Sequence, residues 1–183
     1  MGSIKKELLS GVFYTAIAKY SGILISLIIT GVLARLISPD KFGIVAVVTV
    51  ITFFFSIFSD LGIGAAIIQN KELQQKDLNQ LFSFTVWSGC ILTLLFFLCS
   101  WPISFFYKEP GMKTITQLLA INLFFASANI VPNALLYKAK AFKFLAWRSL
   151  GVQVSGGIIA ILAALGGAGL YALIINPILS SIL

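Results

Sequence analysis

Histidine is absent from the 183-residue sequence, and cysteine occurs only twice, at Cys90 and Cys99. Without histidine, the sequence lacks the commonest metal ligand and general base of proteins. The two cysteines lie in one apolar run, and their spacing on a helix points them about 180° apart, so that they cannot pair there. No Walker-type glycine loop is present. We therefore expect no enzyme, no cofactor and no metal site, and we interpret both cysteines as small apolar residues.

Charge is also scarce, because only 10% of the residues are charged and six are acidic. Hydrophobic residues make up 59% of the chain, and the mean hydropathy is +1.02. A soluble domain has about a quarter charged residues, so this composition could not cover a folded surface in water. The net charge of +7 comes from basic residues in short connectors, a distribution that excludes nucleic acid as a partner and favours contact with anionic membrane lipids.

Most of the sequence consists of long apolar runs. A spanning helix needs about 20 apolar residues, and the sequence offers six candidate runs, at about 12–37, 42–69, 78–107, 114–137, 147–165 and 168–183. The second contains Asp60, the fourth contains Pro132, and the sixth has few residues left after the turn at 166–169 (GGAG). The runs lack the alternation of barrel strands. We predict an all-α membrane protein, a polytopic helical bundle that forms one domain over residues 1–183.

The orientation of this bundle follows from the basic residues of its connectors, because loops on the cytoplasmic side are enriched in lysine and arginine. With the N-terminus inside, the inner segments hold Lys5, Lys6, Lys71, Lys76, Lys138, Lys140, Lys143 and Arg148. The outer connectors hold only Arg35, Lys41, Lys108 and Lys113. The bias predicts a cytoplasmic N-terminus.

Four segments carry a resemblance to a known family. They are residues 34–43 (ARLISPDKFG), 60–69 (DLGIGAAIIQ), 142–146 (FKFLA) and 167–173 (GAGLYAL). In their order and placement they resemble the polysaccharide and lipid-linked oligosaccharide flippases of the multidrug/oligosaccharidyl-lipid/polysaccharide exporter superfamily. The sequence departs from the family pattern at Lys143, where arginine is frequent, and at Tyr171, where tryptophan is frequent.

The resemblance implies a fold of two similar helical lobes around a central cavity, of which this chain resembles most of the N-terminal lobe, with the C-terminal lobe absent. It implies a multi-pass protein of the bacterial cytoplasmic (inner) membrane that translocates undecaprenyl-diphosphate-linked sugar units for surface polysaccharide biosynthesis. Its implied partners are the lipid-linked oligosaccharide substrate, membrane lipids and the polysaccharide polymerase machinery. Two alternatives stay open: a multidrug-type efflux transporter of the same superfamily, or a truncated chain without transport activity.

Lys19 and Asp60 are the first candidate site residues, since a charge inside a span is a functional hypothesis by default. Lys19 belongs to a polar stripe on the first helix, Thr15, Lys19, Gly22, Ser26 and Thr30, which would either line a polar route or pack against another helix. Both charges lie about 10–13 Å from the inner surface at 1.5 Å per residue. We expect them to be neighbours, with Lys19 binding a phosphate or, alternatively, extending to the interface.

The fourth run carries Asn122, Asn129 and Asn133 on one helical face, and the basic segment that follows ends in Arg148. Amides find no partner in hydrocarbon, so this face should point into the bundle. Its amides would either hydrogen-bond between helices or line a sugar-binding cavity. Residues 138–148 interleave basic and aromatic residues, a pattern typical of an interfacial segment that contacts anionic lipid or the diphosphate.

Overall fold

The computed structural model describes the backbone of residues 2–60, 62–70 and 72–182, and their side chains apart from those of 2–10, 12 and 60. Within these ranges all regular structure is helical, which confirms the predicted all-α class. The helices are α1 (Gly2–Leu36), α2 (Pro39–Asp60), α3 (Ile63–Gln69), α4 (Gln75–Tyr107), α5 (Pro110–Ala128), α6 (Ile130–Lys138), α7 (Phe142–Leu165) and α8 (Ala172–Ile182), with a 3-10 turn, η1, at Gly169–Tyr171.

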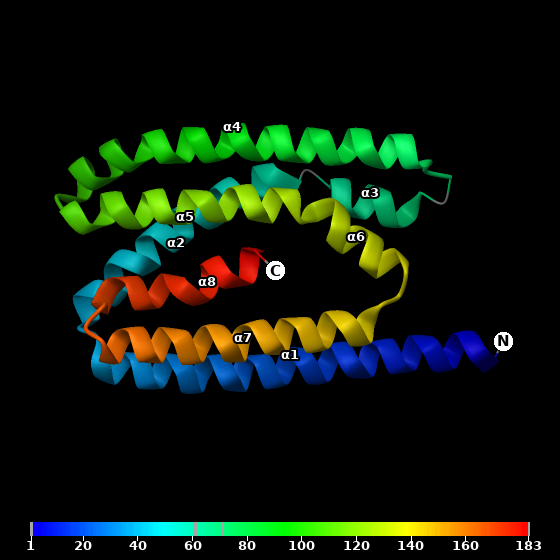
Figure 1. Cartoon of the computed structure of the whole chain (residues 1–183), viewed down its shortest axis with the longest axis horizontal. Helices are drawn as coiled ribbons and strands as arrows, with labels where there is room; N and C mark the ends of the chain where they lie inside the picture. Colours follow the sequence, from blue (N-terminus) through cyan, green and yellow to red (C-terminus); the bar gives the residue numbers. More distant parts are fainter. Residues whose placement is uncertain (1, 61, 71, 183) are drawn as a thin grey trace.

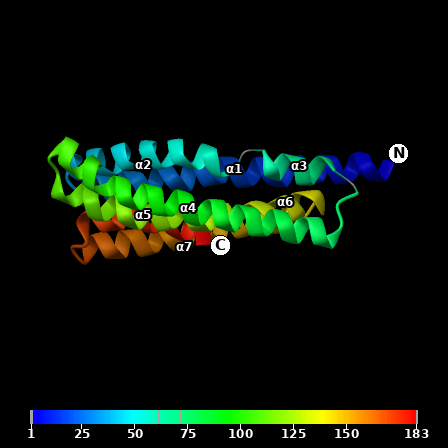
Figure 2. The same ribbon diagram turned by 90° about the horizontal axis from the view of Figure 1, so that it is seen from above.

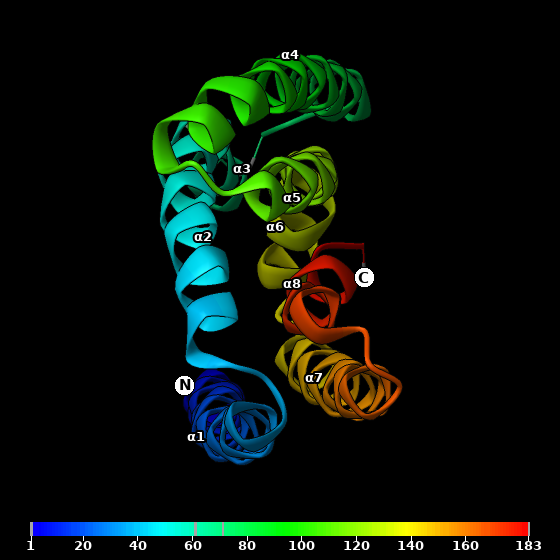
Figure 3. The ribbon, with the colours of Figure 1, turned by 90° about the vertical axis from the view of Figure 1, so that its left-hand side faces the viewer.

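The helices α1, α4, α5, α7 and α8 run roughly along one long axis, whereas α2 and α6 are inclined to it (Figures 1 and 2). α1 and α7 pack together along one edge and α4 and α5 along the other, while α2 and α8 lie between these pairs (Figure 3). In the described part of the chain five helical segments are long and apolar enough to cross a membrane: Phe13–Leu36, Pro39–Ser59, Gln75–Tyr107, Pro110–Lys138 and Phe142–Leu165. The protein is thus a multi-pass membrane protein, and α8 is a shorter apolar helix.

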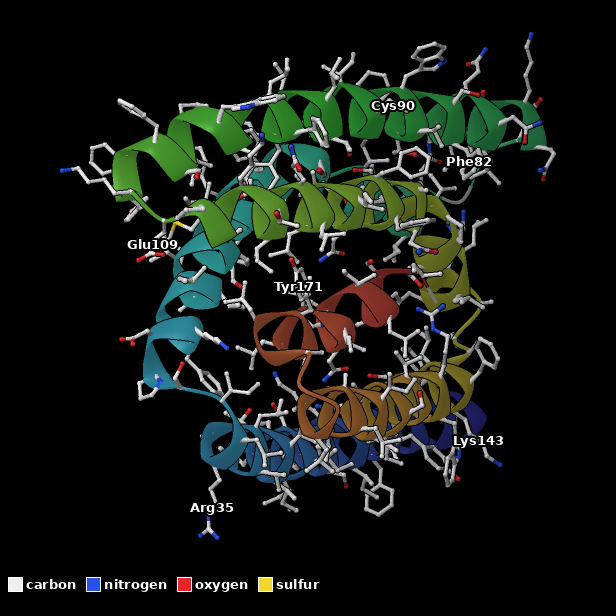
Figure 4. The ribbon with its side chains drawn as sticks, turned by 60° about the vertical axis from the view of Figure 1, so that its left-hand side comes forward. Arg35, Phe82, Cys90, Glu109, Lys143 and Tyr171 are labelled. Atoms are coloured by element: carbon white, nitrogen blue, oxygen red, sulfur yellow. The ribbon has the colours of Figure 1, made fainter. Side chains whose placement is uncertain are left out.

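Three apolar clusters hold the bundle together. The largest joins α2, α4, α5 and α8 around Val48, Phe96 and Leu119, all of which are buried. A second joins α1, α7 and α8, and a third joins α3 and α6. Many large apolar side chains remain exposed on the outside, for example Phe105, which is 86% exposed. This distribution is the one expected where lipid rather than water covers the surface. Cys90 lies on the exposed side of α4, and both cysteines are free (Figure 4).

The helix predicted over 42–69 is interrupted, which corrects that boundary. α2 ends at Asp60 and α3 begins at Ile63, because Gly62 between them adopts a left-handed conformation with φ 77°. Glycine enters this region without the steric cost that a Cβ imposes. The chain therefore changes direction two-thirds of the way along the predicted span.

The helix predicted over 114–137 is also divided, at Asn129, into α5 and α6. Pro132 has no N–H to donate to the carbonyl of residue 128, and its ring clashes with that carbonyl, so the helix cannot pass this point unchanged. α3 and α6, the two segments that follow the interruptions, pack on each other through Ile67, Val131 and Ala134. They form a small helical pair at one end of the bundle (Figure 1).

The connectors alternate between the two ends of the bundle. The start of α1, the α3–α4 connector and the α6–α7 connector lie at one end, whereas the α1–α2, α4–α5 and α7–α8 connectors lie at the other (Figure 1). The three regions that were predicted to be cytoplasmic, namely the start of α1 and the α3–α4 and α6–α7 connectors, therefore lie at the same end of the bundle. Other helix starts also differ from the prediction, most of all those of α1, which already begins at Gly2, and α7, which begins at Phe142.

Candidate functional site

Lys19 lies in a cavity of about 230 Å³ between α1, α6 and α7. The cavity is lined by Thr15, Ala18, Lys19, Tyr137, Phe142, Leu145, Ala146 and Ser149. The hydroxyl of Thr15 already donates to the Gly11 carbonyl oxygen, 2.8 Å away. The remaining donors are the exposed Lys19 ammonium and the hydroxyls of Tyr137 and Ser149. A cation beside hydroxyl donors is a suitable lining for an anionic oxygen, such as that of a phosphate.

Other basic side chains near this cavity contact the protein itself. Arg148 donates from Nη2 to Asn133 Oδ1 at 2.8 Å, which joins α7 to α6. Lys138 donates from Nζ to the Asn70 carbonyl oxygen at 2.7 Å, which joins α6 to the end of α3. The Lys143 ammonium lies 6.0 Å from the ring centroid of Tyr14, at the limit of a cation–π contact. Among the described residues that line the cavity, Lys19 is the basic one.

The polar stripe of α1 divides into two parts. Gly22 is buried against α7, where its carbonyl oxygen accepts a hydrogen bond from Gln153 Nε2 at 2.8 Å. Ser26 and Thr30, in contrast, are exposed. The packing interpretation therefore applies to Gly22, and the polar-route interpretation remains for the hydroxyl residues and Lys19.

The expected pairing of Lys19 with Asp60 assumed that the first two helices run side by side. Instead, α1 packs along α7, while α2 leaves the end of α1 and crosses the bundle towards α4 and α5 (Figure 3). The reason is packing: Ile29 and Leu33 of α1 are buried with Ala160 of α7. The side chain of Asp60 lies outside the described residues, so the predicted ion pair itself stays a prediction.

The three asparagines have different surroundings, because the interruption at Asn129 divides the face on which they were predicted. Asn129 donates from Nδ2 to the Ser181 carbonyl oxygen of α8 at 2.7 Å, and Asn133 accepts from Arg148. Both therefore hydrogen-bond between helices. Asn122 instead lines a second cavity, between α2, α5 and α8.

This second cavity has a volume of about 190 Å³. Its lining residues are Thr49, Thr52, Phe53, Ser56, Leu119, Asn122, Leu123, Ala126 and Pro177. Thr49, Phe53 and Ser56 follow one another at helical spacing on one face of α2. In the described chain no group of three or more cysteine, aspartate or glutamate side chains is placed to hold a metal ion.

Sequence reasoning missed Tyr137, Ser149 and Gln153, which face α1 from α6 and α7. Their roles depend on the pairing of α1 with α7, which are separated by more than a hundred residues. One signal was present, since Gln153 is an uncharged polar residue in an apolar run and Gly156 and Gly157 follow it. Such small residues allow close helix approach, and both glycines are buried.

Comparison with known proteins places this architecture in a family. Residues 32–183 match the model of a family described as polysaccharide biosynthesis protein. The chain is 27% identical over 158 residues to the lipopolysaccharide biosynthesis protein WzxC of Escherichia coli, an alignment that covers 86% of this chain and 31% of WzxC. It is 28% identical over 121 residues to the teichuronic acid biosynthesis protein TuaB of Bacillus subtilis, covering 66% of this chain and 25% of TuaB.

The succinoglycan biosynthesis transport protein ExoT of Rhizobium meliloti is 22% identical over 151 residues, covering 82% of this chain and 31% of ExoT. The chain thus spans about a third or less of the length of these relatives. No solved structure matches it significantly. The family model covers most of the helical bundle described above, from the last turn of α1 to the end of the chain. This multi-pass membrane protein therefore belongs to the polysaccharide biosynthesis protein family.

Proposed function

We propose that this chain is part of a flippase that moves lipid-linked sugar units across the bacterial inner membrane for surface polysaccharide synthesis. The observation that carries the proposal is the family match over residues 32–183. The relatives that support it are named for lipopolysaccharide biosynthesis, teichuronic acid biosynthesis and succinoglycan biosynthesis transport. In this proposal the chain supplies one helical lobe of a longer transporter, and it works as a carrier without enzymatic activity.

The site proposed for the charged part of the substrate is the cavity of Lys19. A polyprenyl diphosphate keeps its tail in the hydrocarbon and needs a polar place for its phosphates near the membrane surface. Lys19 lies six residues inside the candidate span that begins at Phe13, which is about 9 Å at 1.5 Å per residue. Its ammonium, together with the hydroxyls of Tyr137 and Ser149, offers donors to a phosphate at that depth.

A transport assay in cells tests the function. Deletion of the gene that encodes the chain should cause lipid-linked sugar units to accumulate on the inner leaflet and surface polysaccharide to disappear, and the intact gene should restore both. The measurement is mass spectrometry of extracted polyprenyl lipids, together with staining of the cell surface. An unchanged lipid pool combined with altered drug accumulation would instead identify the efflux alternative.

The orientation is a separate prediction. We infer that the end of the bundle with the α6–α7 connector is cytoplasmic, because the connectors at this end carry most of the basic residues. In intact cells of a variant without its two native cysteines, Lys113→Cys at the start of α5 should react with an impermeant maleimide. Lys140→Cys, in the α6–α7 connector, should react only after the membrane is opened. The reverse labelling pattern would invert the bundle.

A further inference from the structure

The cavity between α2, α5 and α8 is lined by uncharged residues, and this lining suits a ligand other than the charged headgroup. We propose that it binds one neutral sugar residue of the carried glycan. This inference rests on the proposed function and adds a second subsite to it. The two cavities lie between different helices, since the cavity of Lys19 is bounded by α1, α6 and α7. The phosphate and the sugar would therefore contact separate parts of the same bundle.

Two of the three hydroxyls that line this cavity, those of Thr52 and Ser56, are oriented as hydrogen-bond acceptors towards it. Thr52 donates its hydroxyl proton to the Val48 carbonyl oxygen at 2.8 Å, and Ser56 donates to the Phe53 carbonyl oxygen at 2.7 Å. Each proton is therefore engaged within α2, and the lone pairs of each oxygen remain for a partner in the cavity. A sugar presents several hydroxyl protons on its rim, so it can donate to both oxygens.

Asn122 supplies both a donor and an acceptor on the facing helix. The other two asparagines of the predicted stripe hydrogen-bond to neighbouring helices, whereas the Asn122 amide forms no such bond with the described residues. It lies near the middle of the Pro110–Lys138 span, about 18 Å from the nearer end at 1.5 Å per residue. An amide at this depth has no lipid partner, so a ligand or water in the cavity must satisfy it.

The remaining lining and the volume also fit a single sugar ring. Phe53, Leu119, Leu123 and Pro177 provide apolar surface opposite the C–H face that a pyranose ring presents. A volume of about 190 Å³ is that of about six water molecules at about 30 Å³ each, the size class of one ring rather than of a bare ion. None of the described lining residues is charged, which disfavours a phosphate or a lone cation here.

Binding to two lipids that differ only in the glycan tests this inference. The intact protein in nanodiscs is titrated with the lipid-linked oligosaccharide fraction of the host cell and, separately, with bare undecaprenyl diphosphate. Asn122→Leu should weaken binding of the glycan-bearing lipid about tenfold and Ser56→Ala about threefold, the effect of losing one hydrogen bond. Neither variant should change binding of the bare lipid, whereas Lys19→Ala should weaken both.

The control is Ser155→Ala on α7, because the Ser155 hydroxyl also donates to backbone carbonyls but lies outside both cavities. It should bind both lipids as the unmodified protein does. Should Asn122→Leu fold poorly, Ser56→Ala provides the test, because it removes only one hydroxyl, which bonds within its own helix. Equal binding of the glycan-bearing lipid by Ser56→Ala and Ser155→Ala would overturn the sugar subsite alone. Failure of the unmodified protein to bind either lipid would overturn the proposed function with it.

Discussion

Replacing Lys19 by alanine in the intact protein should reduce translocation about ten- to a hundredfold while the protein remains in the membrane at its normal level. The range corresponds to the loss of one charge-assisted hydrogen bond, about 1.5–3 kcal/mol. Lys19 is exposed in its cavity, so alanine leaves neither a clash nor a buried unpaired charge. The measurement is the rate at which lipid-linked sugar reaches the outer leaflet, normalised to protein quantity.

Two further variants separate transport from a purely interfacial role of this lysine. Lys19→Arg keeps the positive charge and should retain part of the activity. Lys76→Ala removes an exposed lysine from the first turn of α4 and should leave transport unchanged. If Lys19→Ala transports as well as Lys76→Ala, then the Lys19 side chain only extends to the lipid headgroups, and the phosphate subsite is elsewhere.

The membrane class and the helical segments were predictable from composition, because lipid leaves few alternatives for an apolar chain. With no water to satisfy backbone groups, a run of about 20 apolar residues can only be a helix or part of a closed barrel. The five long spans accordingly lie where the apolar runs indicated. The shortness of the last helix also agrees with the residues left after 166–169.

The interruptions at Gly62 and Asn129 were not predictable from hydropathy, because each lies within a long run of mainly apolar residues. The sequence does contain their causes, a glycine after Asp60 and a proline three residues after Asn129. However, Pro102 and Pro177 lie inside α4 and α8 without dividing them. Whether a proline ends a helix in the membrane depends on which neighbouring groups satisfy the freed carbonyls, which is a property of the whole bundle.

The candidate site shows the same division between local and long-range information. Charge and depth made Lys19 a candidate, and amide chemistry made Asn122 one, because both arguments use only a residue and its position in one span. The assignment of helix neighbours used proximity in sequence, and it paired the first helix with the second. The structure pairs α1 with α7, because the small residues of α7 let the two helices approach closely.

Gly157→Leu should be the most destabilising single substitution in the α1–α7 interface. Gly157 is buried, and a Cβ at this position would already overlap the side chain of Ile29 on α1. Leucine adds three more carbons to that overlap, so the two helices must separate along the cluster of Ile29, Leu33 and Ala160. We expect a loss of about 3 kcal/mol in the free energy of unfolding, measured by detergent titration of the purified protein.

Gly151 on the same helix provides the matched control, since a Cβ there meets no atom within 4 Å. Gly151→Ala should be neutral or stabilising, because alanine favours a helix over glycine by about 1 kcal/mol. Gly157→Ala receives the same helical benefit but must displace Ile29, so it should lose stability overall. The double variant Ile29→Ala with Gly157→Ala should recover part of that loss, because Ile29→Ala removes the atoms that overlap. If the stability losses of Ile29→Ala and Gly157→Ala simply add in the double variant, α1 and α7 do not pack through Gly157. Equal stability of Gly151→Ala and Gly157→Ala would show the same.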